Sequence, residues 1–125
     1  MHKGFLKAAV LLGALSVALG AFAAHGLKEI ISEKSLQTFE TGVRYQFYHS
    51  FALLAAAMLY KEFNNRFVIW ACRLFVGGIF LFSGSLYLLS LLQPEFSFIG
   101  AITPFGGVSF LAGWIMLYVS FSKKG

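Results

Sequence analysis

The side chains best able to do chemistry are concentrated in one polar stretch of the chain. They are His25, Glu40, Arg44, Tyr45, Gln46, Tyr48 and His49. Imidazole, carboxylate, guanidinium, phenol and amide groups together donate and accept hydrogen bonds and carry charge of either sign. Such a set suits the binding of a small polar or lipid-like ligand, or the movement of a proton. We expect a ligand-binding site in this stretch.

The spacing of these residues indicates a helix. Apolar side chains recur every three or four positions, at Leu36, Phe39, Val43 and Phe47, followed by Ser50. This periodicity predicts an amphipathic helix over residues 35–49, continuous with or leading into the next apolar run. Glu40 precedes Arg44 by four residues, the order that favours a helical ion pair. Tyr45 and His49 are also four apart and therefore share a face.

His49 is the residue of this set that most needs a partner. If the membrane boundary falls near Arg44, the imidazole lies about 7 Å deeper, because each helical residue rises about 1.5 Å. An ionisable group at that depth faces the bundle or a wet cavity. Two interpretations stay open: His49 belongs to a functional site, or it is hydrogen-bonded into the packing. Tyr45 and Tyr48 have an alternative role as anchors at the membrane interface.

Metal binding and catalysis find little support in the residue types present. His25 and His49 are possible ligands for a metal ion or a haem iron. However, the chain has no Asp, no Cys-x-x-Cys-His, no His-x-x-x-His and a single cysteine, Cys72. We expect no metal and no cofactor. Ser83, Ser85 and Cys72 are conceivable nucleophiles, but no G-x-S-x-G motif is present, so we expect that the protein is not an enzyme.

The composition requires that lipid, and not water, surround these elements. Of 125 residues, 58% are hydrophobic and only 12% charged, and the chain contains 15 Phe. A soluble domain of this size leaves about a third of its unfolded surface exposed and has little room to bury so many aromatic rings. We expect an all-α integral membrane protein with one domain over residues 1–125.

Four apolar runs predict four transmembrane helices. They cover residues 5–24, 45–60, 67–92 and 105–121. Each approaches or exceeds the roughly 17 to 25 residues that a spanning helix needs, and the second is the weakest. The first run ends in an A-x-A pattern at Ala21 and Ala23, which is also typical of a signal-peptide cleavage site. Because that run is longer than a signal-peptide core, we expect a mature helix.

The distribution of Lys and Arg predicts the orientation. If the N-terminus is cytoplasmic, seven basic residues lie inside and three outside. The inner set is Lys3, Lys7, Lys61, Arg66, Arg73, Lys123 and Lys124, and the outer set is Lys28, Lys34 and Arg44. The imbalance predicts two cytoplasmic termini in the cell membrane. The net charge of +5 forms no stripe, so we expect membrane lipids as partners and no nucleic acid.

Small residues predict close helix packing. Ser16, Gly20 and Ala24 recur at every fourth position of the first run, and the later runs contain several glycines. Such residues let helix backbones approach within a bundle or between copies, so a homo-oligomer is possible. Thr103 and Pro104 predict the start of the fourth helix, with a hinge at Pro104 as the alternative.

Four motifs in chain order resemble one known family. They are Gly20-Ala-Phe-Ala-Ala-His-Gly-Leu27, Arg44-Tyr-Gln-Phe-Tyr-His49, Phe82-Ser-Gly-Ser-Leu-Tyr87 and Ile102-Thr-Pro-Phe-Gly-Gly107, the last leading to Gly113-Trp114. The chain is similar over nearly its whole length to the domain-of-unknown-function 423 family, also called uncharacterised protein family 0382. One departure is alanine at Ala23 or Ala24, where the family commonly has glycine. The resemblance implies a four-helix fold in the cytoplasmic membrane and no particular activity.

Two functions remain in competition. The first is a binding or transport module, in which the seven polar residues line a site in the outer half of the bundle, completed by Ser83, Ser85, Tyr87 and Thr103. The second is a structural or accessory membrane protein, in which the same polar residues hold the helices together and the surface binds another copy or a partner. A cavity beside His49 and Arg44 distinguishes the two.

Overall fold

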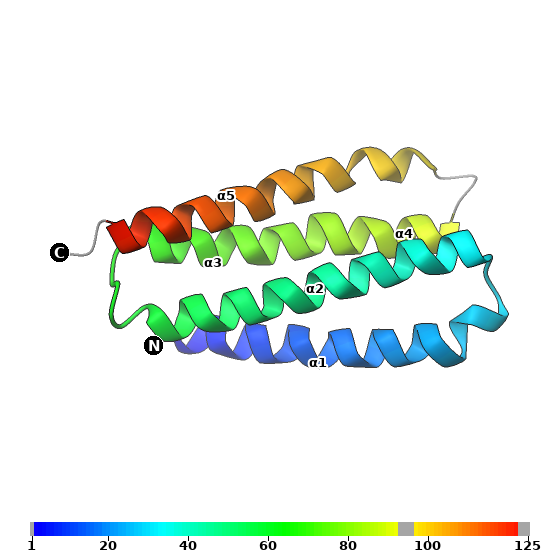
Figure 1. Cartoon of the computed structure of the whole chain (residues 1–125), viewed down its shortest axis with the longest axis horizontal. Coiled ribbons are helices and arrows are strands. Elements are labelled where there is room, and N and C mark those ends of the chain that lie inside the picture. Colours follow the sequence, from blue (N-terminus) through cyan, green and yellow to red (C-terminus); the bar gives the residue numbers. More distant parts are fainter. Residues whose placement is uncertain (1, 93–96, 123–125) are drawn as a thin grey trace.

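The computed structural model describes residues 2–92 and 97–122 as an antiparallel bundle of four helical rods (Figure 1). The elements are α1 (Lys3–His25), η1 (Leu27–Glu29), α2 (Glu33–Leu59), α3 (Arg66–Gly78), η2 (Ile79–Ser83), α4 (Gly84–Leu92), η3 (Ser97–Ala101) and α5 (Thr103–Ser122). Of these, α3, η2 and α4 follow one another without a break and form the third rod. No strand occurs among the described residues, and the predicted all-α fold of four helices is confirmed.

Side-chain caps set where three of the rods begin. Nδ1 of His2 accepts a hydrogen bond from the amide of Phe5 at 3.2 Å and caps α1. The hydroxyl of Ser32 does the same for α2, and Oδ1 of Asn65 accepts two amides at the start of α3. Each cap satisfies amides that the first helical turn leaves without a partner.

The fourth rod begins where Thr103 and Pro104 predicted. The helix runs from Thr103 to Ser122 without interruption, so Pro104 is no hinge. The hydroxyl of Thr103 also makes a contact between helices. It lies 2.6 Å from that of Ser85 and joins α5 to α4.

The predicted amphipathic segment and the second apolar run form a single helix. α2 extends over 27 residues, and its capping serine comes shortly before the predicted start at residue 35. α1 packs mainly against α2, and α5 mainly against α3, so that α2 and the α3–α4 rod form the centre of the bundle (Figure 1). The polar front half of α2 is therefore placed beside both α1 and α4.

Two apolar clusters hold the rods together. The larger joins α1, α2, α3 and α5 and contains Ala9, Ala52, Leu53, Ala56, Val68, Ala71, Cys72, Phe75 and Leu117. The smaller joins the ends of α1 and α2 through Ala23, Leu27 and Phe39. Cys72 is a buried member of the larger cluster, as expected for a small apolar side chain.

Glycines allow the closest helix crossings. A Cβ atom at Gly106 would collide with the backbone of Phe82, and one at Gly113 would lie 2.7 Å from the Phe75 ring. The expectation of tight packing is wrong for Gly84, because a Cβ atom there would meet no atom within 4 Å. On α1 the predicted small-residue face is used in part, since Ser16 is buried and Ala24 is exposed.

Three helical segments are long and apolar enough to cross a membrane: Lys3–Glu29, Arg66–Leu92 and Ser97–Ser122. The second predicted span does not meet this measure, so the expectation of four such helices is not fulfilled. The reason is composition, because polar side chains continue along α2 through Arg44, Gln46 and His49. Whether α2 crosses as well remains a prediction.

Candidate functional site

His49 lies in the middle of α2 with only 5% of its surface exposed, and both of its ring nitrogens have partners. Nδ1 lies 2.8 Å from the carbonyl oxygen of Tyr45, one turn earlier. Nε2 lies 3.1 Å from the indole Nε1 of Trp114 on α5. A carbonyl only accepts and an indole N–H only donates. The geometry therefore assigns the neutral ring with its proton on Nδ1.

Aromatic rings cover the faces of the His49 imidazole. The Phe110 ring stacks on it with centroids 3.6 Å apart and planes inclined by 9°. The rings of Phe75 and Trp114 lie within 6 Å of it, and that of Tyr45 slightly further. The imidazole is thus enclosed by protein atoms. Within residues 2–92 and 97–122, no group of three His, Cys, Asp or Glu side chains is placed to hold a metal ion.

Gln46 connects three rods. It is 1% exposed, and its Nε2 donates to the carbonyl oxygen of Leu12 on α1 at 2.9 Å. Its Oε1 accepts from the hydroxyl of Tyr87 on α4 at 2.6 Å. The carbonyl of Leu12 also accepts from Ser16, and the carbonyl of Gln46 accepts from Ser50. A single amide side chain therefore fixes α1 and α4 against α2.

Hydroxyl groups make further bonds between the rods. Ser83 donates to the carbonyl of Gly42 at 2.6 Å, joining η2 to α2. Ser109 donates to the carbonyl of Leu74 at 2.7 Å, joining α5 to α3. In the part of the chain that the structure describes, no buried side-chain nitrogen or oxygen lacks a hydrogen-bond partner. Of the serines considered as nucleophiles, Ser83 thus acts as an interhelical donor, whereas Ser85 donates to the carbonyl of Phe82 on its own rod.

The other five candidate residues lie further out. His25 is exposed at the end of α1, Glu40 is half-buried, and Arg44, Tyr45 and Tyr48 are exposed. Phe39 packs near Phe22 at the His25 end of α1, and His49 comes ten residues later on α2, about 15 Å away at 1.5 Å per residue. The structure therefore does not bring the two histidines together.

The predicted Glu40–Arg44 ion pair is wrong. Nη2 of Arg44 donates to the hydroxyl of Thr41 at 3.0 Å, and no ion pair between Glu40 and Arg44 occurs among the described residues. A bond to a residue three positions earlier keeps the guanidinium beside its own helix. Arg44 thus has spare N–H donors on an exposed face.

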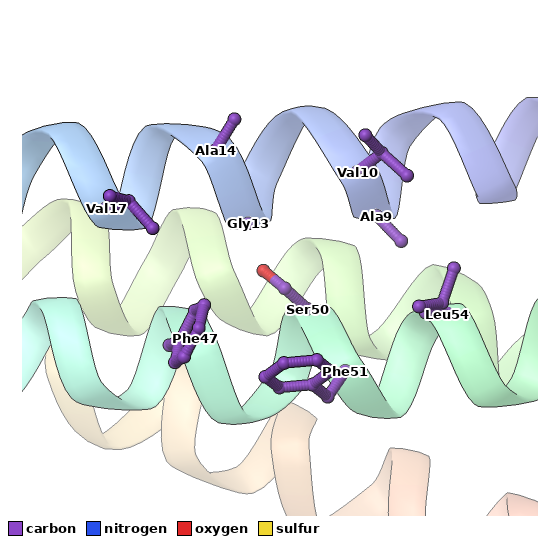
Figure 2. Close-up of a pocket in the computed structure, with 9 residues that line it drawn as sticks. All are labelled: Ala9, Val10, Gly13, Ala14, Val17, Phe47, Ser50, Phe51 and Leu54. Atoms are coloured by element: carbon purple, nitrogen blue, oxygen red, sulfur yellow. The ribbon is translucent and has the colours of Figure 1, made fainter.

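A hollow runs along the outer face of α1 and α2 (Figure 2). It measures about 200 Å³ and is lined by Ala9, Val10, Gly13, Ala14, Val17, Phe47, Ser50, Phe51 and Leu54. An adjoining hollow of about 220 Å³ shares Val17 and Phe47 with it and is also lined by Ser16, Val43, Arg44 and Tyr48. Together they form what is called below the α1/α2 groove.

A more polar depression lies at the end of the bundle. It measures about 460 Å³ and is lined by Ile30, Ile31, Ser32, Lys34, Ser35, Ser90 and Leu91. Its lining comes from the loop before α2, the first turn of α2 and the last turn of α4. None of the seven residues expected to bind a ligand lines it.

Sequence comparison places the chain among membrane proteins. Residues 19–107 match the family model described as "Protein of unknown function (DUF423)". The UPF0382 membrane protein YwdK of Bacillus subtilis is 46% identical over 123 residues, covering 94% of this chain and 98% of the relative. A UPF0382 membrane protein of Haemophilus influenzae is 44% identical over 125 residues, with 99% and 98% covered.

A third relative is the UPF0382 inner membrane protein YgdD of Escherichia coli. It is 38% identical over 111 residues, which cover 89% of this chain and 83% of the relative. No solved structure matches the chain.

Proposed function

This chain belongs to the DUF423 family of membrane proteins, and we propose that it is an accessory membrane protein that acts through its outer surface and has no catalytic or transport activity. The polar residues inside the bundle then serve to hold the rods in register. The outer surface meets lipid, a partner protein or another copy.

The observation that supports this proposal is the closed set of hydrogen bonds at His49. A binding or transport path needs polar groups that can exchange their partners with a ligand or with water. Both nitrogens of His49 are committed to protein atoms, and Phe110 covers a ring face. Gln46 is committed in the same way to Leu12 and Tyr87. Buried networks of this kind rigidify a core when every member is satisfied.

We also propose that α2 is a fourth span and that both termini are cytoplasmic, in the cytoplasmic membrane. α2 lies antiparallel to α1 and returns the chain to the end where α3 begins (Figure 1). If the three apolar segments cross, a helix of 27 residues between the first two crosses with them. Its polar side chains are tolerated because Gln46 and His49 are hydrogen-bonded inside the bundle. The excess of Lys and Arg supports the orientation.

Cysteine accessibility tests the closed core. In a Cys72→Ala background, a His49→Cys variant in intact cells is expected to resist a small membrane-impermeant thiol reagent from either side. Lys34→Cys is the control, because Lys34 is exposed at the start of α2. Labelling of Lys34→Cys from outside also supports the orientation. Rapid labelling of His49→Cys, with helix content unchanged, would overturn the proposal in favour of a water-filled path.

The second candidate function is ligand binding at the polar depression near Lys34 and Ser90. Its support is the size of that depression and the ammonium group at its edge. A Lys34→Ala variant would then lose the stabilisation that small anionic solutes give to the detergent-solubilised protein in thermal unfolding. Lys28→Ala, which removes a nearby exposed charge outside the depression, is the matched control.

A further inference from the structure

We propose that the α1/α2 groove binds an anionic phospholipid, with one acyl chain along the groove and the phosphate at Arg44. The inference deepens the proposed function, because it names a partner for the outer surface. It is carried by the shape of the groove, its length and the charge at one end.

The shape follows from small residues opposite large ones. Gly13 and Ala14 on α1 leave the groove open, whereas Phe47 and Phe51 on α2 form its wall (Figure 2). The two rings contact edge to face with centroids 4.8 Å apart, which fixes their positions. Ser50 also lines this part, but its hydroxyl donates to the carbonyl of Gln46 at 2.7 Å. The surface offered to an occupant is therefore apolar.

The length fits one leaflet of a bilayer. From Arg44 to Leu54 the groove follows α2 for ten residues, about 15 Å at 1.5 Å per residue. The hydrocarbon region of a bilayer is about 30 Å thick, so one leaflet contributes about 15 Å. An acyl chain that starts at Arg44 and follows the groove thus extends to about Leu54, a length comparable to one leaflet.

Arg44 supplies the charge at the outer end. It lines the groove beside Val43 and Tyr48 and comes five residues after Phe39, which packs by Phe22 near the end of α1. The guanidinium therefore belongs to the region just inside the membrane boundary. A cation in this position on an exposed face is stabilised by an anion, because an unpaired charge in lipid is costly.

A phosphate diester can supply the anion that pairs with the Arg44 guanidinium. Arg44 makes one side-chain hydrogen bond, to Thr41, and no ion pair with any described residue, so most of its five N–H groups remain available. A planar guanidinium binds two phosphate oxygens at once, a geometry that a zwitterionic head group weakens by its own ammonium charge. Anionic lipid is the occupant whose charge and length both match the groove.

Native mass spectrometry of the full chain released from mixed micelles tests the proposal. Phosphatidylglycerol and phosphatidylcholine with identical acyl chains are the two probes. The unaltered protein is expected to retain phosphatidylglycerol about tenfold more strongly, the scale of one charge-assisted bond. Arg44→Gln removes that preference, whereas Arg66→Gln, which removes an exposed arginine outside the groove, keeps it.

A second pair of variants tests the groove itself. Ala14→Phe fills the apolar hollow and is expected to lower the retention of both lipids, while Ala18→Phe, at an exposed position of α1 outside the lining, leaves it unchanged. Equal retention of the two lipids, unaffected by Arg44→Gln, would refute the proposal. So would a dimer that Ala14→Phe dissociates, because the groove would then bind a second copy. These outcomes are independent of the His49→Cys labelling, so the two proposals fail separately.

Discussion

The indole Nε1 of Trp114 donates a hydrogen bond of 3.1 Å to Nε2 of His49, across the contact between α5 and α2. The two residues are 65 positions apart in the chain. Their bond, with the one to the Tyr45 carbonyl, explains how a histidine is accommodated among four aromatic rings. It also defines the first tests of the structure.

Replacing Trp114 with Phe leaves Nε2 of His49 without a donor. The expected loss in free energy of unfolding is about 1 kcal/mol, because hydrogen bonds between membrane helices are worth about that much. Thermal unfolding in a mild detergent measures it. Trp70→Phe is the control, because Trp70 is exposed and its ring contacts the guanidinium of Arg73 without a hydrogen bond to His49. Equal stability of the two variants would contradict the assigned bond.

The tautomer of His49 is a second prediction. Because Nδ1 faces a carbonyl and Nε2 faces an N–H, nitrogen NMR is expected to show a neutral ring protonated at Nδ1. His25 provides an exposed reference signal in the same sample. A His49 ring protonated at Nε2 in the unaltered protein would mean that Trp114 is not its donor.

Gln46 and Tyr87 are expected to be coupled. Gln46→Leu removes the bonds to Leu12 and Tyr87, and Tyr87→Phe removes only the second. In a double-mutant cycle, the effects on the free energy of unfolding should fall short of additive by about 0.5 to 2 kcal/mol. A coupling near zero would show that the 2.6 Å bond adds nothing to stability.

Gly106 and Gly84 are expected to respond oppositely to alanine. At Gly106 the added methyl group collides with the backbone of Phe82, which cannot rotate away, so Gly106→Ala should destabilise the bundle by about 1 to 3 kcal/mol. Gly84→Ala meets no atom within 4 Å and should be neutral or slightly stabilising, because alanine favours helix. Chemical unfolding monitored by circular dichroism compares them, and similar losses would contradict the α5–η2 crossing.

Much of the fold follows from the sequence because it depends on local composition. Long apolar runs predict helices, and the three-to-four spacing of Leu36, Phe39 and Val43 predicts the amphipathic half of α2. The start of α5 at Thr103 is also local information. The polar side chains of α2, charged and uncharged, keep it below the hydropathy expected of a spanning helix, although it packs between α1 and α3 in the structure.

The partners of the polar residues were not predictable, because they depend on helix rotation and on backbone atoms. The predicted depth of His49 in the membrane shows that its ring needs a hydrogen-bond partner. The identity of that partner could not be predicted, because it depends on how α5 is rotated about its axis. The acceptor for Gln46 is the carbonyl of Leu12, a group every residue possesses. The prediction of a Glu40–Arg44 pair was wrong because the Arg44 guanidinium donates instead to the hydroxyl of Thr41, three positions earlier.

The π-helical turn η2, at Ile79–Ser83, has a consequence for how the third rod tolerates change in length. Such a turn holds one residue more than an α-helical turn, and each residue of an α-helix corresponds to about 100° of rotation. Loss of one residue here would let the turn close as an α-helical one, so α4 would keep its orientation, and Ser85 and Tyr87 would still face Thr103 and Gln46. The third rod can thus lose a residue within η2 and keep the polar side chains of α4 inside the bundle, whereas the same deletion in the regular turns of α3 would rotate them by about 100°.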